Sequence, residues 1–126
     1  MIKNSIEQRN LIHSKDIILI YNILRQLGLP PTLKGTKLLN KAIQIFVNTN
    51  NEFIILEDIY NKIAANNNFN NSQIRNAIKY AIDNRNEEKS KSNFEKIFGY
   101  KYDNYYFTNK TIIEEIARII NNQRNR

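Results

Sequence analysis

The apolar residues of the chain recur at intervals of three and four positions rather than two. This spacing predicts an all-α fold, because a residue returns to the same face of a helix after three or four positions. We expect a six-helix domain. Five of its helices are expected at Lys15–Leu27, Thr36–Asn48, Ile54–Asn66, Asn71–Arg85 and Asn93–Phe98. The sixth, capped by Thr108 or Asn109, is expected to end at about Asn121.

Glycine, proline and asparagine mark the expected breaks between helices. Gly28 is expected to cap the first helix, and the proline pair 30–31 prevents its continuation. The asparagine-rich tract 66–71 predicts a turn, because asparagine tolerates left-handed backbone conformations and bonds to its own backbone. We expect Asn71 or Ser72 to cap the helix that follows this turn.

The third and fourth helices, joined by this short turn, have the arrangement of a helix-turn-helix. One face of the fourth helix is apolar and is expected in the core: Ile74, Ala77, Ile78, Ala81 and Ile82. The opposite face is polar and is expected to be exposed near the start of the helix: Ser72, Gln73, Arg75, Asn76 and Lys79. These residue types suit DNA, since arginine pairs with guanine, asparagine and glutamine pair with adenine, and serine and lysine contact phosphates. The alternative is an ordinary solvated face, which most amphipathic helices have.

The length of 126 residues fits one domain. We expect an N-terminal arm over residues 1–15, a helix-turn-helix DNA-binding domain over 16–122 and a frayed tail over 123–126. The arm is interpreted as a packed or disordered extension, with a partner-docking segment as the alternative. The charged segment 84–92 is interpreted as a linker between the fourth and fifth helices.

The formal net charge of +7 and the isoelectric point of about 9.7 favour an anionic partner, nucleic acid above all. A basic protein without any specific polyanion partner is the alternative. The chain contains no cysteine, which excludes disulfides and thiolate metal sites and fits the cytoplasm. No run of eighteen apolar residues is present, and the N-terminal residues do not read as a secretory signal.

Enzyme chemistry finds little support among the titratable residues. His13 is the only histidine, and with no cysteine available we expect no metal site. The pairs Glu57-Asp58 and Glu114-Glu115 are adjacent in sequence, so their side chains diverge on a helix and do not form a catalytic dyad. Three dispersed glycines cannot build a phosphate-binding loop. We therefore expect no enzyme and no cofactor.

Short matching segments along nearly the whole chain point to a known family. They occur at residues 27–30, 33–35, 38–39, 42–43, 59–60, 63–64, 72, 77–78, 81–82, 98–100 and 108–109. In these segments the chain resembles the DNA-binding domain of the sporulation stage-zero master regulator of endospore-forming Firmicutes. The Gly-Pro turn, the Lys-Gly pair, and the later Phe-Gly and Thr-Asn pairs make the resemblance specific, and it extends over about Asp16 to Ile120.

The resemblance implies a six-helix effector domain in which the fourth helix is the recognition helix. It also implies phosphate contacts near Lys34-Gly35 and head-to-tail pairing of domains on tandem DNA sites. A homodimer, a full-length sporulation regulator and RNA polymerase are further candidate partners.

Three departures from the family change what we expect. Family members carry a phosphorylated receiver domain, whereas only about fifteen residues precede the first helix here, so we expect DNA binding without phosphorylation. Where the family has Arg, Glu, Arg and Arg, this chain has Gln73, Arg75, Asn76 and Lys79, so we expect a different target sequence. The loop 101–107 is rewritten with several tyrosines, which could pack, dimerise or touch a DNA backbone.

The leading hypothesis is a sequence-specific transcriptional regulator of duplex DNA. Arg75, Asn76 and Gln73 would read bases, while Lys79, Ser72 and Lys34 would hold phosphates. A second hypothesis is a protein-interaction module that binds or antagonises a full-length sporulation regulator. A third is non-specific coating of DNA.

Overall fold

The computed structural model describes residues 15–49 and 54–124, and this part of the chain contains six α-helices and no strand. A helix over residues 15–26 is followed by α2 (Lys34–Asn48), α3 (Leu56–Ala65), α4 (Asn71–Asp83), α5 (Glu87–Phe98) and α6 (Asn109–Arg124). A single 3-10 turn, η1 (Asn104–Tyr106), lies between α5 and α6. The predicted all-α, six-helix fold is therefore confirmed. Most of the expected arm, part of the loop after α2 and the last two residues lie outside the described residues.

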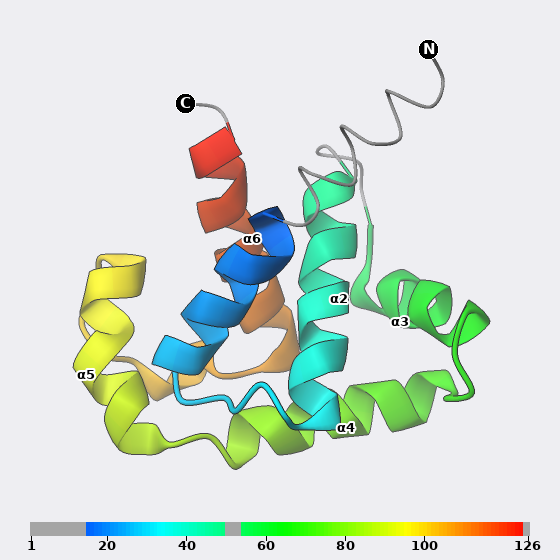
Figure 1. The fold of residues 1–126 in the computed structure, drawn as a ribbon, viewed down its shortest axis with the longest axis horizontal. Coiled ribbons are helices and arrows are strands. Elements are labelled where there is room, and N and C mark those ends of the chain that lie inside the picture. The colour runs from blue at the N-terminus through cyan, green and yellow to red at the C-terminus, as the bar shows by residue number, and fades with distance from the viewer. Residues whose placement is uncertain (1–14, 50–53, 125–126) are drawn as a thin grey trace.

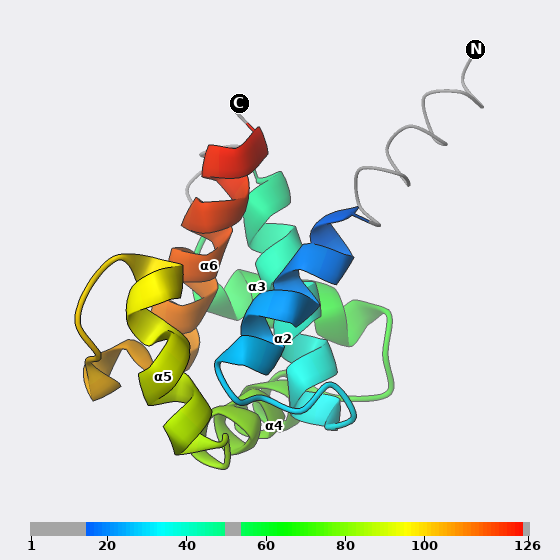
Figure 2. The ribbon, with the colours of Figure 1, turned by 60° about the vertical axis from the view of Figure 1, so that its left-hand side comes forward.

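The helix α2 is the centre of the fold, and it packs against α3, α4 and α6. The helix α4 lies across one end of α2 and α6 in both views (Figures 1 and 2). Every helix contributes fully buried side chains to one hydrophobic core. Among them are Leu24, Ile43, Ile59, Ile78, Phe94 and Ile112. Because α4 covers the end of the core with one face only, its other face is left exposed.

Two glycines fix where helices meet or end. Gly28 has a φ of +93° and ends the first helix as predicted. Its carbonyl also accepts a hydrogen bond from the backbone nitrogen of Asn86 at 2.9 Å, so the turn lies against the start of α5. Gly99 ends α5 with a φ of +81°. A positive φ is a backbone conformation that residues with a side chain rarely adopt, so replacing either glycine would strain the backbone.

The charged segment before the fifth helix is helical rather than a linker. The helix α5 begins at Glu87, six residues earlier than expected, and the side chain of Asn86 accepts a hydrogen bond from the backbone nitrogen of Lys89. Ser90 and Phe94, one turn apart, are both buried. The prediction was wrong because Ser90 is the only buried residue near the start of α5, and the charged residues around it hide the periodic spacing of an amphipathic helix.

Other helix ends also differ from the sequence prediction. The helix α2 begins two residues early, at Lys34, with Leu33 at its N-cap position. The helix α4 is capped by Asn70 rather than Asn71 or Ser72, and it ends at Asp83. The helix α6 continues to Arg124, whose guanidinium pairs with the carboxylate of Asp16 at the start of the first helix. That ion pair joins the last described turn to the rest of the domain.

Candidate nucleic-acid interface

A reciprocal pair of hydrogen bonds sets the start of α4. The side chain of Asn70 accepts from the backbone nitrogen of Gln73 at 2.8 Å, and the side chain of Gln73 accepts from the backbone nitrogen of Asn70 at 2.9 Å. This capping box satisfies two backbone donors that the helix leaves unpaired. The Asn71 side chain also donates to the side chain of Asn61 on α3 at 2.8 Å. The turn between α3 and α4 is therefore held at both sides, in the helix-turn-helix order that the sequence predicts.

The two faces of α4 divide as the sequence predicts. Ile74, Ile78, Ala81 and Ile82 are buried, and Ala77 is half-buried. All five polar residues predicted to face outward are exposed, and we call them the outer face of α4: Ser72, Gln73, Arg75, Asn76 and Lys79. No described segment covers this face, so its side chains are accessible to a ligand.

Gly35 explains how α4 is held at a close distance from α2. It lies in the first turn of α2 and is buried, and a β-carbon there would overlap the carbonyl of Ala77 and lie 2.8 Å from the β-carbon of Ala81. The resemblance implied a phosphate contact at this glycine. Its burial and its contact with α4 give it a packing role, and a phosphate contact at Gly35 stays a prediction.

Lys34, the neighbour of Gly35, is exposed. Its ammonium nitrogen lies 4.0 Å from the centre of the Phe69 ring, in the turn that precedes α4. This cation–π contact holds the charge of Lys34 close to the start of the outer face of α4. A phosphate contact by Lys34 stays a prediction.

The side chains of the outer face differ in how free they are. Within the described part of the chain, no hydrogen bond is recorded for the side chains of Ser72 and Asn76, whereas the Gln73 carbonyl oxygen belongs to the capping box. Gln73 can therefore contact a base through its amide NH₂ only, as long as the capping box stays intact. Asn76 is therefore the freer of the two amides for reading an adenine.

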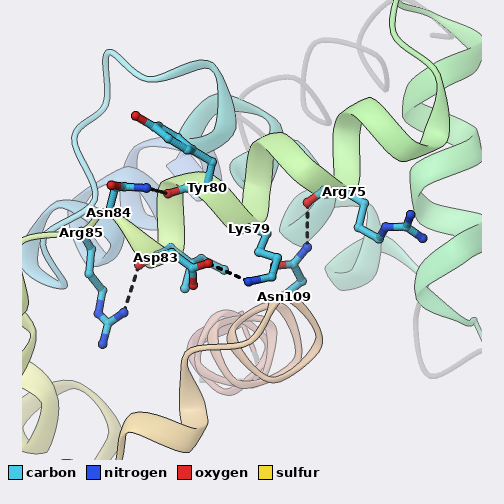
Figure 3. A network of polar contacts seen from close by, with 8 residues as sticks. Arg75, Lys79, Tyr80, Asp83, Asn84, Arg85 and Asn109 are labelled. Carbon is cyan, nitrogen blue, oxygen red and sulfur yellow. Dashed lines mark hydrogen bonds and ion pairs between the residues drawn. The ribbon is translucent and has the colours of Figure 1, made fainter.

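Lys79 has a partner that the sequence interpretation did not include. Its ammonium nitrogen lies 2.7 Å from a carboxylate oxygen of Asp83, one turn later (Figure 3). Both side chains are at least half exposed, at 65% and 50%. Exposed pairs of this kind contribute only about 0.2–1 kcal/mol, so a phosphate can compete for Lys79. The spacing of four residues between a lysine and an aspartate was the available signal.

Arg75 lies where three helices meet. The side chain of Asn109, at the start of α6, donates to the backbone carbonyl of Arg75 at 3.1 Å (Figure 3). It also donates to the hydroxyl of Tyr60 on α3 at 2.9 Å. Burial raises the pKa of Tyr60 above its ordinary value, and the Asn109 hydrogen bond opposes the rise. The phenol therefore stays protonated near neutral pH. Asn109 fixes the backbone that carries Arg75, while the Arg75 side chain remains exposed.

The tyrosine-rich loop is organised by Arg85, just after α4. The guanidinium donates to the hydroxyl of Tyr102 at 3.0 Å, to the side chain of Asn104 at 2.9 Å and to the hydroxyl of Ser90 at 2.9 Å. It also lies 3.6 Å from the centre of the Phe107 ring. Of the three roles considered for this loop, these contacts support packing.

Tyr80 is an exposed residue beside the outer face that sequence reasoning passed over. Its side chain is 61% exposed and follows Asn76 by one helical turn. The four-residue spacing from Asn76 was the signal, but an aromatic residue within an amphipathic helix is usually assigned to the core.

Comparisons with known proteins give one result. Residues 20–120 match the family model described as "Sporulation initiation factor Spo0A C terminal". No curated protein and no solved structure matches the chain. Among the described helices, none combines the length and the apolar character needed to span a membrane.

Proposed function

The chain belongs to the family of the Spo0A C-terminal domain, a DNA-binding domain of sporulation regulators and not an enzyme family, and we propose that it is a sequence-specific transcriptional regulator. The outer face of α4 carries this proposal. It combines side chains that pair with base edges and a lysine suited to phosphate, on a helix whose other face is buried.

Each exposed residue has a role in the proposal. Arg75 and Asn76 read base edges in the major groove, and Gln73 adds a contact through its amide NH₂. Lys79, Ser72 and Lys34 hold phosphates and set the orientation of the helix. The capping box and the Asn109 hydrogen bond support these roles, because both fix the backbone of α4 before DNA arrives.

Binding to DNA does not require phosphorylation in this proposal. The support is that no described segment covers the outer face of α4, so no part of residues 15–49 or 54–124 has to move before the helix enters a groove. Treatment of the chain with a small phosphodonor is expected to leave its affinity for duplex DNA unchanged. A change in affinity would contradict this part of the proposal.

Selection of bound duplexes from a random pool tests the main proposal. We expect one motif to be enriched, and we expect it to differ from the family's target because the base-facing residues differ. Binding without enrichment of any motif would favour non-specific coating of DNA. No binding to any duplex would show that the proposed function is wrong.

A second candidate is contact with another sporulation regulator or a second copy of this chain on tandem sites. Tyr105 and Tyr100 on the loop before α6 are 87% and 54% exposed, and exposed tyrosines are enriched at protein interfaces. Capture of a full-length regulator from nuclease-treated lysate would support this candidate. If the regulator is captured from untreated lysate but not from nuclease-treated lysate, the two proteins meet only when both are bound to DNA.

A further inference from the structure

A groove of about 340 Å³ runs between α4 and the start of α6, beside the outer face of α4. Figure 3 shows Lys79 and Asp83 on the flank of α4 that faces the first turn of α6. The groove is lined by Leu56, Tyr60, Arg75, Lys79, Asp83, Phe107, Thr108, Asn109 and Lys110. It is therefore continuous with the surface to which we assign DNA binding.

The lining has an apolar part and a charged part. Tyr60 and Phe107 are buried and Leu56 is half-buried, so they form an apolar floor. Three lining residues are cationic, namely Arg75, Lys79 and Lys110, against the single carboxylate of Asp83. An anionic ligand with an apolar portion fits this distribution of charge.

Lys110 is the cation that the proposed function has not used. Its side chain is 76% exposed, and its nearest carboxylate, on Glu114, lies 4.0 Å away at the limit of an ion pair. Such a contact restrains the ammonium group only weakly. Lys110 reaches the groove from α6, whereas Arg75 and Lys79 reach it from α4.

We propose that this groove holds the sugar–phosphate backbone of one DNA strand, with Lys110 contacting a phosphate. The inference rests on the proposed function. A helix about 10–12 Å across nearly fills a major groove about 12 Å wide, so the two strands pass along its two flanks. Lys34 lies over Phe69, in the turn that precedes α4, and Lys110 lines the groove between α4 and the start of α6. Deoxyribose is the apolar portion that covers the floor, and phosphate is the anion.

The salt dependence of binding tests this assignment, because each phosphate contact changes the slope of log affinity against log salt by about 0.9. Lys110→Ala is expected to lower the slope by about one and to weaken binding by about fivefold to tenfold at 0.1 M salt, on every duplex alike. Lys110→Arg keeps the charge and is expected to keep both values. Lys96→Ala, on the exposed side of α5, is the control and is expected to change neither.

The outcomes distinguish failure of the groove assignment from failure of the proposed function. If Lys110→Ala keeps the wild-type slope and affinity, the groove does not hold a DNA strand, although the proposed function stands. If the wild-type chain binds no duplex, the proposed function and this inference are both wrong. Thermal unfolding of the three variants shows whether each remains folded, and the Arg variant separates loss of charge from loss of structure.

Discussion

The outer face of α4 and the loop between α5 and α6 both carry several side chains that can form hydrogen bonds, yet the two regions use them differently. In the loop, Tyr102 and Asn104 accept hydrogen bonds from Arg85, and the rings of Tyr102, Tyr106 and Phe107 pack against Phe94. On α4, Ser72, Arg75 and Asn76 point their side chains into solvent. Most of the loop is engaged with the protein, whereas the outer face of α4 is available to a ligand.

This difference separates stability from function. The side chains of Tyr102 and Asn104 in the loop form hydrogen bonds with Arg85. A substitution that removes Arg85 should therefore lower the free energy of unfolding. Because the exposed side chains of Ser72, Arg75 and Asn76 make few contacts within the protein, substitutions of these residues should change DNA binding while the free energy of unfolding stays within about 0.5 kcal/mol of the wild type.

Arg85→Ala is expected to have the largest effect. The change removes the hydrogen bonds to Tyr102, Asn104 and Ser90 and the contact with the Phe107 ring, so it should lower the free energy of unfolding by about 2–4 kcal/mol. Urea unfolding measures this loss. Tyr105→Ala in the same loop is the control, because its 87% exposed side chain predicts almost no change. Equal losses in the two variants would contradict the role given to Arg85.

Arg75→Ala is expected to cost about 1–3 kcal/mol of binding on the selected duplex and to relax the preference for one base. The physical reason is the loss of a bidentate contact to a base edge. Titration of duplexes that vary at one base pair measures both effects, with Lys96→Ala as the matched loss of an exposed cation. An Arg75→Ala chain that keeps its affinity and its base preference would remove Arg75 from the reading surface.

Lys34→Ala is expected to weaken binding to all duplexes by the same factor and to lower the salt slope by about one. A phosphate contact carries no sequence information, which is why the base preference should stay unchanged. Affinity measured over a range of salt on selected and random duplexes tests this. A loss confined to the selected duplex would assign Lys34 to base reading instead.

Asp83→Asn is expected to have the smallest effect, and it should strengthen binding. The substitution removes a negative charge from the flank of α4 and frees Lys79 from its exposed ion pair, which is worth about 0.2–1 kcal/mol. A gain in affinity of that size at low salt, diminishing at high salt, is the expected result. Weaker binding by the variant would show that Asp83 itself contacts DNA.

Much of the fold and of the outer face of α4 could be predicted from local patterns. The four-residue spacing of Ile74, Ile78 and Ile82 is enough to assign the buried face of α4, and Gly28 is enough to end the first helix. These features depend on neighbours in the same helix or turn, so the sequence contains their signal directly.

The remaining features depend on residues that are distant in sequence. Gly35 is explained by Ala77 and Ala81 on another helix, and the role of Asn109 depends on Tyr60 and the backbone of Arg75. Ser90 marks the buried side of α5 because its hydroxyl donates to the carbonyl of Leu27. Single-sequence periodicity contains no signal for such contacts, which is why the start of α5 was predicted wrongly and the packing of Gly35 against α4 was not predicted.

The most direct test of the account is a titration of the ¹⁵N-labelled chain with a duplex, followed by the amide resonances of both compared regions. We predict that the resonances of Ser72, Arg75 and Asn76 shift with added DNA, while those of Tyr100 and Tyr105 in the loop stay in place. Shifts at Tyr100 and Tyr105 with unchanged resonances along α4 would contradict the claim that α4 is the DNA-binding helix.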